Sequence, residues 1–115
     1  MTGWGLTENQ LASKEMAMTY LPVQSNQNCL EAYAKMNFRL NLTNGQFCAG
    51  LIGHKNACKG DGGSPLVFYD SDADRYTVEG LVSFELTGEC GFSNVYSVFT
   101  RVSFFMPWLL QNWPR

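Results

Sequence analysis

Residues 56–67 read Asn-Ala-Cys-Lys-Gly-Asp-Gly-Gly-Ser-Pro-Leu-Val, and this stretch decides how the rest of the chain is interpreted. Three glycines within residues 59–65 predict a tight turn, because glycine adopts backbone conformations that other residues avoid. The mostly apolar residues 66–69 predict a strand that begins directly after the turn. A strand that starts from a glycine-rich turn indicates a fold built from short strands.

Alternating apolar residues predict further strands on both sides of this turn. The predicted strands cover residues 14–24, with Pro22 at an edge or a bulge, 46–51, 75–84 and 95–102. Residues 41–45 and the acidic residues 70–74 predict turns. Many short strands separated by turns predict an all-β fold with short helices, organised as a barrel or a sandwich.

Two short helices complete the predicted elements. Ser25 can cap a helix over residues 27–36, because its side-chain oxygen can accept a hydrogen bond from the first turn. Ser103 can cap a C-terminal helix, with Pro107 in the first turn, where the missing proline N–H is tolerated.

The composition is that of one globular domain or a piece of one, with no internal boundary in residues 1–115. Of the 115 residues, 45% are hydrophobic and 16% are charged, and the net charge is −2. A nucleic-acid-binding protein would normally be basic, and a membrane span needs about 20 apolar residues in a row. We therefore expect neither a nucleic-acid partner nor a membrane partner.

Four widely spaced cysteines and a single histidine argue against a metal site. Cys29, Cys48, Cys58 and Cys90 form no closely spaced thiolate pair, and His54 is the one histidine in the chain. We expect no metal and no other cofactor. An even number of cysteines predicts two disulfides in an oxidising compartment, with three possible connectivities. The alternative is four free, buried thiols.

The sequence also contains a glycosylation motif, Asn41-Leu42-Thr43. Together with the predicted disulfides, it favours a secreted, extracellular protein. The first ten residues have neither the basic nor the apolar region of a signal peptide. We therefore expect the chain to begin partway through a longer protein.

The glycine-rich turn resembles the active-site turn of trypsin-like serine proteases, Asp-Ala-Cys-x-Gly-Asp-Ser-Gly-Gly-Pro-Leu-Val. Other family motifs follow in the family's order: Thr2-Gly3-Trp4-Gly5, Cys48-Ala49-Gly50, Val82-Ser83-Phe84, Val95-Tyr96, Thr100-Arg101-Val102 and Trp108. The resemblance implies that residues 1–115 are the second β-barrel of the trypsin-like double-barrel fold, closing with a C-terminal helix. The first barrel is then absent from this chain. The sequence is most similar to clip-domain proteases and non-catalytic protease homologues of arthropods.

The resemblance also assigns roles to the cysteines and to the turn. It implies the disulfides Cys29–Cys48 and Cys58–Cys90. Gly60 and Gly62 match the backbone donors of the oxyanion hole. Asp61 matches the carboxylate that pairs with the new N-terminus after activation cleavage.

The nucleophile position departs from the family pattern. The residue there is Gly62, which has no side chain to be acylated. Ser64 lies two residues later, where its hydroxyl would be displaced from the oxyanion donors, so we do not expect it to replace the nucleophile. The family's His and Asp belong to the first barrel, and we expect His54 to be a solvated loop residue.

The pocket-like positions implied by the resemblance are Asn56, Ala57, Ser83, Phe84, Glu85 and Asn94. Asn56 stands where trypsin-like enzymes carry the Asp that binds a cationic side chain. Glu85 and Asn94 stand where the family has small glycines, so each adds bulk at the pocket. Together with Gly62, these changes predict lost catalysis rather than altered specificity.

These features predict a catalytically inactive serine protease homologue that acts by protein binding, as a cofactor or regulator in an extracellular immune proteolytic cascade. We expect the partner to be a protease or zymogen of the cascade, or the missing N-terminal barrel. Two alternatives are a fragment of a working serine-type endopeptidase and an incomplete gene product. With the first barrel absent, we expect an under-covered aromatic C-terminal end, consisting of Phe104, Phe105, Trp108, Leu109, Leu110 and Trp113.

Overall fold

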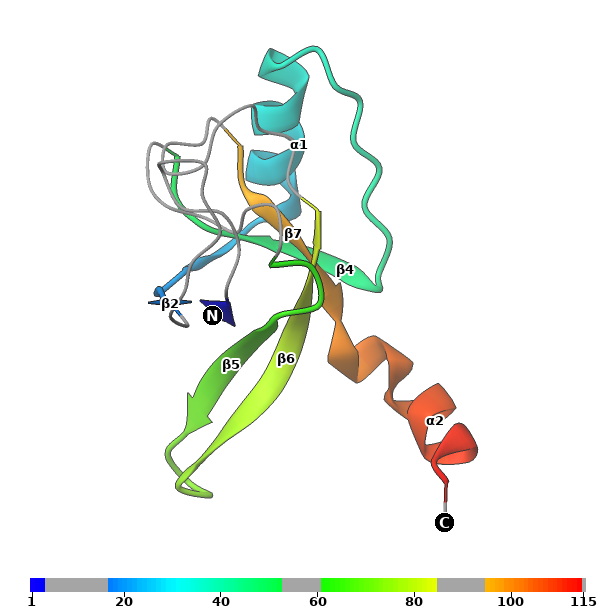
Figure 1. The fold of residues 1–115 in the computed structure, drawn as a ribbon. Helices are drawn as coiled ribbons and strands as arrows, with labels where there is room; N and C mark the ends of the chain where they lie inside the picture. Colours follow the sequence, from blue (N-terminus) through cyan, green and yellow to red (C-terminus); the bar gives the residue numbers. More distant parts are fainter. Residues whose placement is uncertain (4–16, 53–60, 85–94, 115) are drawn as a thin grey trace.

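The structure is a computed structural model that describes residues 1–3, 17–52, 61–84 and 95–114. Its centre is a five-stranded antiparallel sheet with the strand order β3–β4–β7–β6–β5 (Figure 1). The strands are β3 (Val23–Gln24), β4 (Gln46–Ala49), β5 (Pro65–Asp70), β6 (Arg75–Phe84) and β7 (Ser97–Arg101). A separate antiparallel ribbon pairs β1 (Thr2–Gly3) with β2 (Ala17–Met18). The predicted all-β fold with short helices is confirmed.

The sheet buries apolar side chains on both faces, because neighbouring residues of a strand point to opposite sides. On β4, Phe47 belongs to one buried cluster and Cys48 to the other. One cluster consists of Cys29, Ala32, Tyr33, Leu40, Cys48, Val95 and Val98. The other consists of Phe47, Ala49, Leu66, Val82 and Phe99. The second cluster includes residues of β5, which follows the glycine-rich turn, and of β6, to which the turn is hydrogen-bonded.

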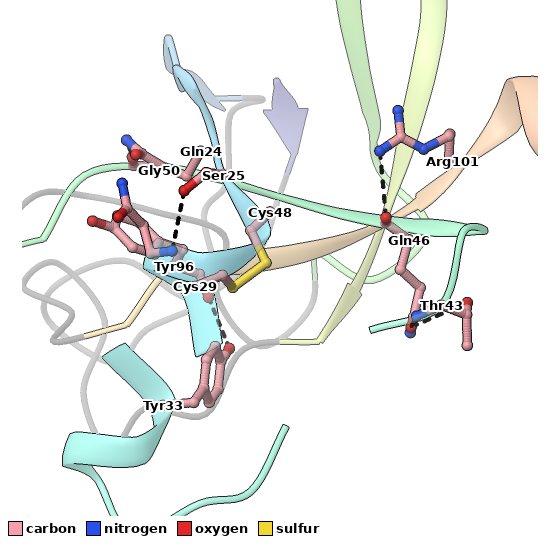
Figure 2. Close-up of a disulfide and its surroundings, with 11 residues drawn as sticks. Gln24, Ser25, Cys29, Tyr33, Thr43, Gln46, Cys48, Gly50, Tyr96 and Arg101 are labelled. Atoms are coloured by element: carbon pink, nitrogen blue, oxygen red, sulfur yellow. Dashed lines mark hydrogen bonds between the residues drawn. A yellow bond between two sulfur atoms is a disulfide. The ribbon is translucent and has the colours of Figure 1, made fainter. Parts of the chain in front are cut away.

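Helix α1 (Asn26–Lys35) covers the first of these faces. The Ser25 hydroxyl accepts a hydrogen bond from the Asn28 backbone N–H at 3.1 Å, which confirms the predicted N-cap. Tyr33 is fully buried, and its hydroxyl donates to the Tyr96 carbonyl at 2.7 Å (Figure 2). The helix is therefore attached to the segment that enters β7.

A disulfide between Cys29 and Cys48 links α1 to β4 (Figure 2). Both cysteines are wholly buried. The pairing implied by the family resemblance is confirmed for this bond. Cys58 and Cys90 lie outside the described residues, so their pairing stays a prediction.

We expect loss of this disulfide to lower the free energy of unfolding by about 3 kcal/mol, because the bond closes a loop with a sequence separation of 19 residues. The single variants Cys29→Ala and Cys48→Ala and the double variant should lose similar amounts, since each removes the same bond. Urea unfolding monitored by tryptophan fluorescence would measure this. Additive losses in the double variant would contradict the prediction.

The predicted hairpin β5–β6 is present, with β5 over residues 65–70 instead of 66–69 and the tip over 71–74 instead of 70–74. Strand β6 covers residues 75–84 as expected, and turn residues 71–74 connect it to β5. The Asp70 carboxylate accepts hydrogen bonds from the backbone N–H groups of Asp72, at 3.0 Å, and Ala73, at 3.3 Å. The Tyr69 hydroxyl donates to Asp74, and this hydrogen bond raises the pKa of Tyr69. The acidic residues of the tip therefore organise the turn.

Several predicted element boundaries are wrong. Residues 17–24 form the two short strands β2 and β3 instead of part of one strand over 14–24, and Pro22 lies between them. The Pro22 carbonyl accepts a hydrogen bond from Gly50 N–H at 2.9 Å, beyond the end of β4. Strand β4 ends at Ala49 and β7 begins at Ser97, so both are shorter than predicted.

The C-terminal helix α2 (Val102–Asn112) begins directly after β7. Its N-cap residue is Arg101, with no side-chain cap, so the predicted Ser103 cap is wrong. Pro107 lies inside the helix and not in its first turn. Its missing N–H leaves the Ser103 carbonyl without the usual helical donor. None of the helices in the described residues is long and apolar enough to cross a membrane.

Helix α2 extends away from the sheet (Figure 1), and none of its residues is buried. Phe104, Phe105, Trp108, Leu110 and Trp113 are exposed. Leu109 is partly covered. The predicted under-covered aromatic end is confirmed for these residues.

Candidate functional site

The glycine-rich stretch forms a closed turn over residues 61–64. The backbone N–H of Ser64 donates to the Asp61 carbonyl at 2.8 Å, with Gly62 and Gly63 at the tip. Gly63 has a φ of 81°, in the left-handed region where a side chain is strained. The turn therefore requires glycine at position 63.

Two hydrogen bonds attach the turn to β6. Gly63 N–H donates to the Val82 carbonyl at 2.8 Å, and Val82 N–H donates to the Ser64 carbonyl at 2.9 Å. The pairing of β6 with β7 shifts register between Val82 and Phe84, and a β-bulge at such a place redirects the side chains around it. Ser83 and Phe84 are both exposed there. The structure thus places the turn beside two of the predicted pocket residues.

Gly62 is exposed at the tip of the turn, and a side chain would fit there. No described atom lies within 4 Å of the position that a Cβ would occupy. Its φ also lies outside the left-handed region. Among the described residues, neither sterics nor backbone conformation therefore requires glycine at position 62, in contrast to position 63.

This contrast predicts different effects for two neighbouring substitutions. Gly63→Ala should lower the free energy of unfolding by about 1–2 kcal/mol, because alanine is strained at positive φ. Gly62→Ala is the matched control and should change it by less than about 0.5 kcal/mol. Urea denaturation of both variants measures the difference. Equal losses would show that the description of the turn is wrong.

The side chains of Ser64 and Asp61 both lie against strand β1. A Cβ added to Gly3 would be 3.2 Å from Ser64 Oγ and would overlap the Asp61 carboxylate. The Asp61 side chain is buried at this contact. Ser64 Oγ is more than 4 Å from the position of a Cβ on Gly62. The hydroxyl of Ser64 is thus displaced from the tip of the turn.

The comparison with known proteins decides the family. A family model named Trypsin matches residues 1–109. The chain belongs to the trypsin family. Its antiparallel sheet and two short helices are therefore those of a trypsin-like domain.

Several trypsin-family relatives of this chain come from arthropods. The chain is 40% identical over 114 residues to Limulus clotting factor C of Carcinoscorpius rotundicauda, covering 96% of this chain and 11% of the relative. It is 33% identical over 112 residues to a CLIP domain-containing serine protease of Bombyx mori, covering 97% and 30%. It is 34% identical over 113 residues to phenoloxidase-activating factor 3 of Holotrichia diomphalia, covering 97% and 31%. The chain thus spans less than a third of the length of these relatives.

Several predicted trypsin-family site residues lie outside the described residues. These are Asn56, Ala57, Gly60, Glu85 and Asn94, together with His54. The altered pocket and the first oxyanion donor therefore stay predictions. The described part of the predicted site consists of Asp61, Gly62, Ser83 and Phe84.

An apolar groove of about 800 Å³, which was not predicted from the sequence, lies between the β1–β2 ribbon and β5. Its lining includes Met1, Met18, Leu21, Leu66, Phe68 and Tyr76. The Met1 backbone nitrogen donates a hydrogen bond to the Thr19 carbonyl at 2.9 Å. Only the alternating apolar residues of the two strand segments indicated this groove in the sequence. It contains no predicted site residue.

Proposed function

We propose that this chain is the second barrel of a catalytically inactive trypsin-family protein that acts by binding another protein. The observation that carries the proposal is Gly62, exposed at the tip of a well-formed turn, in the position where the family motif has its nucleophilic serine. Covalent catalysis needs an oxygen that attacks the substrate carbonyl and becomes acylated. Glycine has no such atom.

Ser64 does not supply the missing nucleophile. Its hydroxyl lies against Gly3 of β1, and its backbone carbonyl accepts the hydrogen bond from Val82 N–H. Moving the hydroxyl to the tip of the turn would require breaking this backbone pairing. Removing the nucleophile alone reduces turnover by about 10⁶-fold in a serine protease, so the site as built supports no useful hydrolysis.

The described framework around the turn is well formed, which supports a binding role. The turn keeps its three backbone hydrogen bonds, and the Cys29–Cys48 disulfide and both apolar clusters are present. A folded domain without a nucleophile can still present a surface. The exposed aromatic residues of α2 are such a surface, because large apolar patches on a protein usually mark interfaces.

The names of the relatives and the disulfide support an extracellular setting. Relatives are named as clotting factors and as a phenoloxidase-activating factor. Disulfides persist in oxidising compartments such as the extracellular space. We therefore propose a secreted cofactor or regulator of an immune proteolytic cascade, whose partner is a protease or zymogen of that cascade. A first trypsin-like barrel is the other candidate partner.

The test measures two quantities: hydrolysis of a peptide ester by the protein alone, and the effect of the protein on the activation of a trypsin-family zymogen. The purified protein is incubated alone with a chromogenic peptide ester, and then with a trypsin-family zymogen and its activating protease from the same source. We expect no hydrolysis by the protein alone, and a changed rate of zymogen activation when it is added.

The variant Trp108→Ser/Leu110→Ser should lose the effect on zymogen activation, whereas Gln111→Ser, on the same helix, should retain it. Hydrolysis of the ester by the protein alone would overturn the proposal. It would support the alternative that the chain is part of a working serine-type endopeptidase.

A further inference from the structure

The segment between α1 and β4 carries the motif Asn41-Leu42-Thr43 on the outside of the molecule (Figure 1). Asn41 and Thr43 are exposed, whereas Leu42 packs against the cluster under α1. Leu40 is buried in the same cluster. The two leucines therefore hold the segment in place while the Asn41 side chain faces solvent.

The motif has the chemistry and the conformation that N-glycosylation requires. The acceptor pattern is Asn-x-Thr with any residue except proline in the middle, and the middle residue is Leu42. Residues 41–43 belong to neither a helix nor a strand. No backbone ladder therefore competes with a modifying enzyme for this segment.

The disulfide provides an independent indication of the compartment. Asn41 lies within the loop that Cys29 and Cys48 close, and both cysteines are fully buried. Such a bond forms in the oxidising lumen of the secretory pathway, and glycosylated Asn-x-Thr motifs are found on the surface loops of secreted proteins. A chain that acquires this disulfide therefore also meets the conditions for glycosylation.

We infer that Asn41 carries an N-linked glycan. In the modifying step, a bond forms between the Asn41 amide nitrogen and the anomeric carbon of an oligosaccharide carried on a lipid pyrophosphate. The bond between that carbon and the pyrophosphate oxygen breaks, and the amide proton leaves to solvent. No atom is oxidised or reduced, and the lipid pyrophosphate is the leaving group.

Thr43 also has a structural role, which determines how the inference is tested. Its hydroxyl accepts a hydrogen bond from Gly45 N–H at 3.2 Å and donates to Gln46 Oε1 at 3.4 Å. Its backbone N–H donates to the same Gln46 oxygen at 3.0 Å (Figure 2). Thr43→Ala would therefore disturb the turn as well as the motif. Thr43→Ser keeps both, and Asn41→Gln removes only the acceptor.

The experiment expresses the full chain with a secretion leader in mammalian cells and measures its intact mass before and after treatment with peptide-N-glycosidase F. We expect a mass loss of one oligosaccharide, with conversion of Asn41 to an acid in the peptide map. Thr43→Ser should retain the modification, and Asn41→Gln should lack it.

Cell-free translation in the presence of microsomes gives a second readout that does not depend on secretion. A shift in mobility should occur for the parent chain and for Thr43→Ser, but not for Asn41→Gln. A parent chain that contains the Cys29–Cys48 disulfide but carries no sugar on Asn41 in either experiment would overturn the inference. So would an unchanged mass loss in Asn41→Gln.

Discussion

The 115-residue chain, produced on its own, is expected to self-associate or to fold only marginally. The reason is α2, in which Trp108 and Leu110 are 61% and 70% exposed, followed by Trp113 at 69%. The helix is tied to the rest of the molecule mainly at its start, where a Cβ on Gly45 would be 3.0–3.2 Å from the rings of Phe104 and Phe105. The remaining aromatic and aliphatic surface faces water.

The free energy involved is large compared with the stability of a domain. Covering apolar surface contributes about 25 cal/mol per Å², so several hundred Å² left in water forfeits on the order of 10 kcal/mol. Whole domains are stable by only about 5–15 kcal/mol. A partner that covers α2, or a second copy of the chain, therefore gains enough to drive association.

Sedimentation velocity and binding of the dye ANS measure this directly. The parent chain should sediment as a dimer or larger species, or bind ANS. Trp108→Ser/Leu110→Ser should shift it toward a monomer with weaker ANS binding, and Gln111→Ser should behave like the parent. A strictly monomeric parent chain with a well-dispersed NMR spectrum and no ANS binding would contradict the prediction.

The variant Gly62→Ser is expected to fold like the parent and still to hydrolyse no peptide ester. The serine side chain meets no described atom within 4 Å, and φ at this position does not oppose it. In the 115-residue chain produced on its own, we expect no histidine to act as the base, because the family resemblance places the triad His and Asp in the first barrel. A serine hydroxyl without a base is a weak nucleophile. The loss of a triad member costs about 10⁴–10⁶-fold in turnover, so restoring one member alone leaves the activity undetectable.

A fluorogenic peptide ester assay, run beside an unfolding curve, separates the two parts of this prediction. The unfolding midpoint should match that of the parent, while the rate of hydrolysis should not exceed that of the parent. Gly62→Ala serves as the control for the added side chain. Hydrolysis by Gly62→Ser above the rates of both the parent and Gly62→Ala would refute the prediction.

Sequence patterns correctly predicted the elements whose structure depends on residues that are close together in the chain. Strand β6 alternates over ten residues from Arg75 to Phe84, next to an acidic turn, and its limits match the prediction. Ser25 caps α1 because the hydrogen bond to Asn28 needs only neighbouring residues. The family motif likewise identified the Cys29–Cys48 disulfide, which joins elements that are distant in sequence.

The errors arise where long-range contacts determine the structure. Helix α2 begins at Val102 because Arg101 is still fixed in β7: its N–H donates to the Gly45 carbonyl at 2.7 Å, and its guanidinium lies over the Phe47 ring. The helix-capping propensity of Ser103 does not depend on these contacts, so it could not predict where the helix begins. The Ser64 side chain lies against Gly3, which is 61 residues away in the sequence, so its direction could not be predicted from neighbouring residues either. In contrast, the absence of a side chain at Gly62 is visible in the sequence itself.

The most direct test of the central claim is reaction of the whole protein, taken from its natural source, with a fluorophosphonate probe. The probe phosphonylates an activated serine hydroxyl and releases fluoride, so it reports the nucleophile regardless of substrate specificity. Intact-mass spectrometry should show no adduct on this protein under conditions in which active trypsin is labelled completely. Stoichiometric labelling, at Ser64 or at any other serine of the chain, would contradict the account.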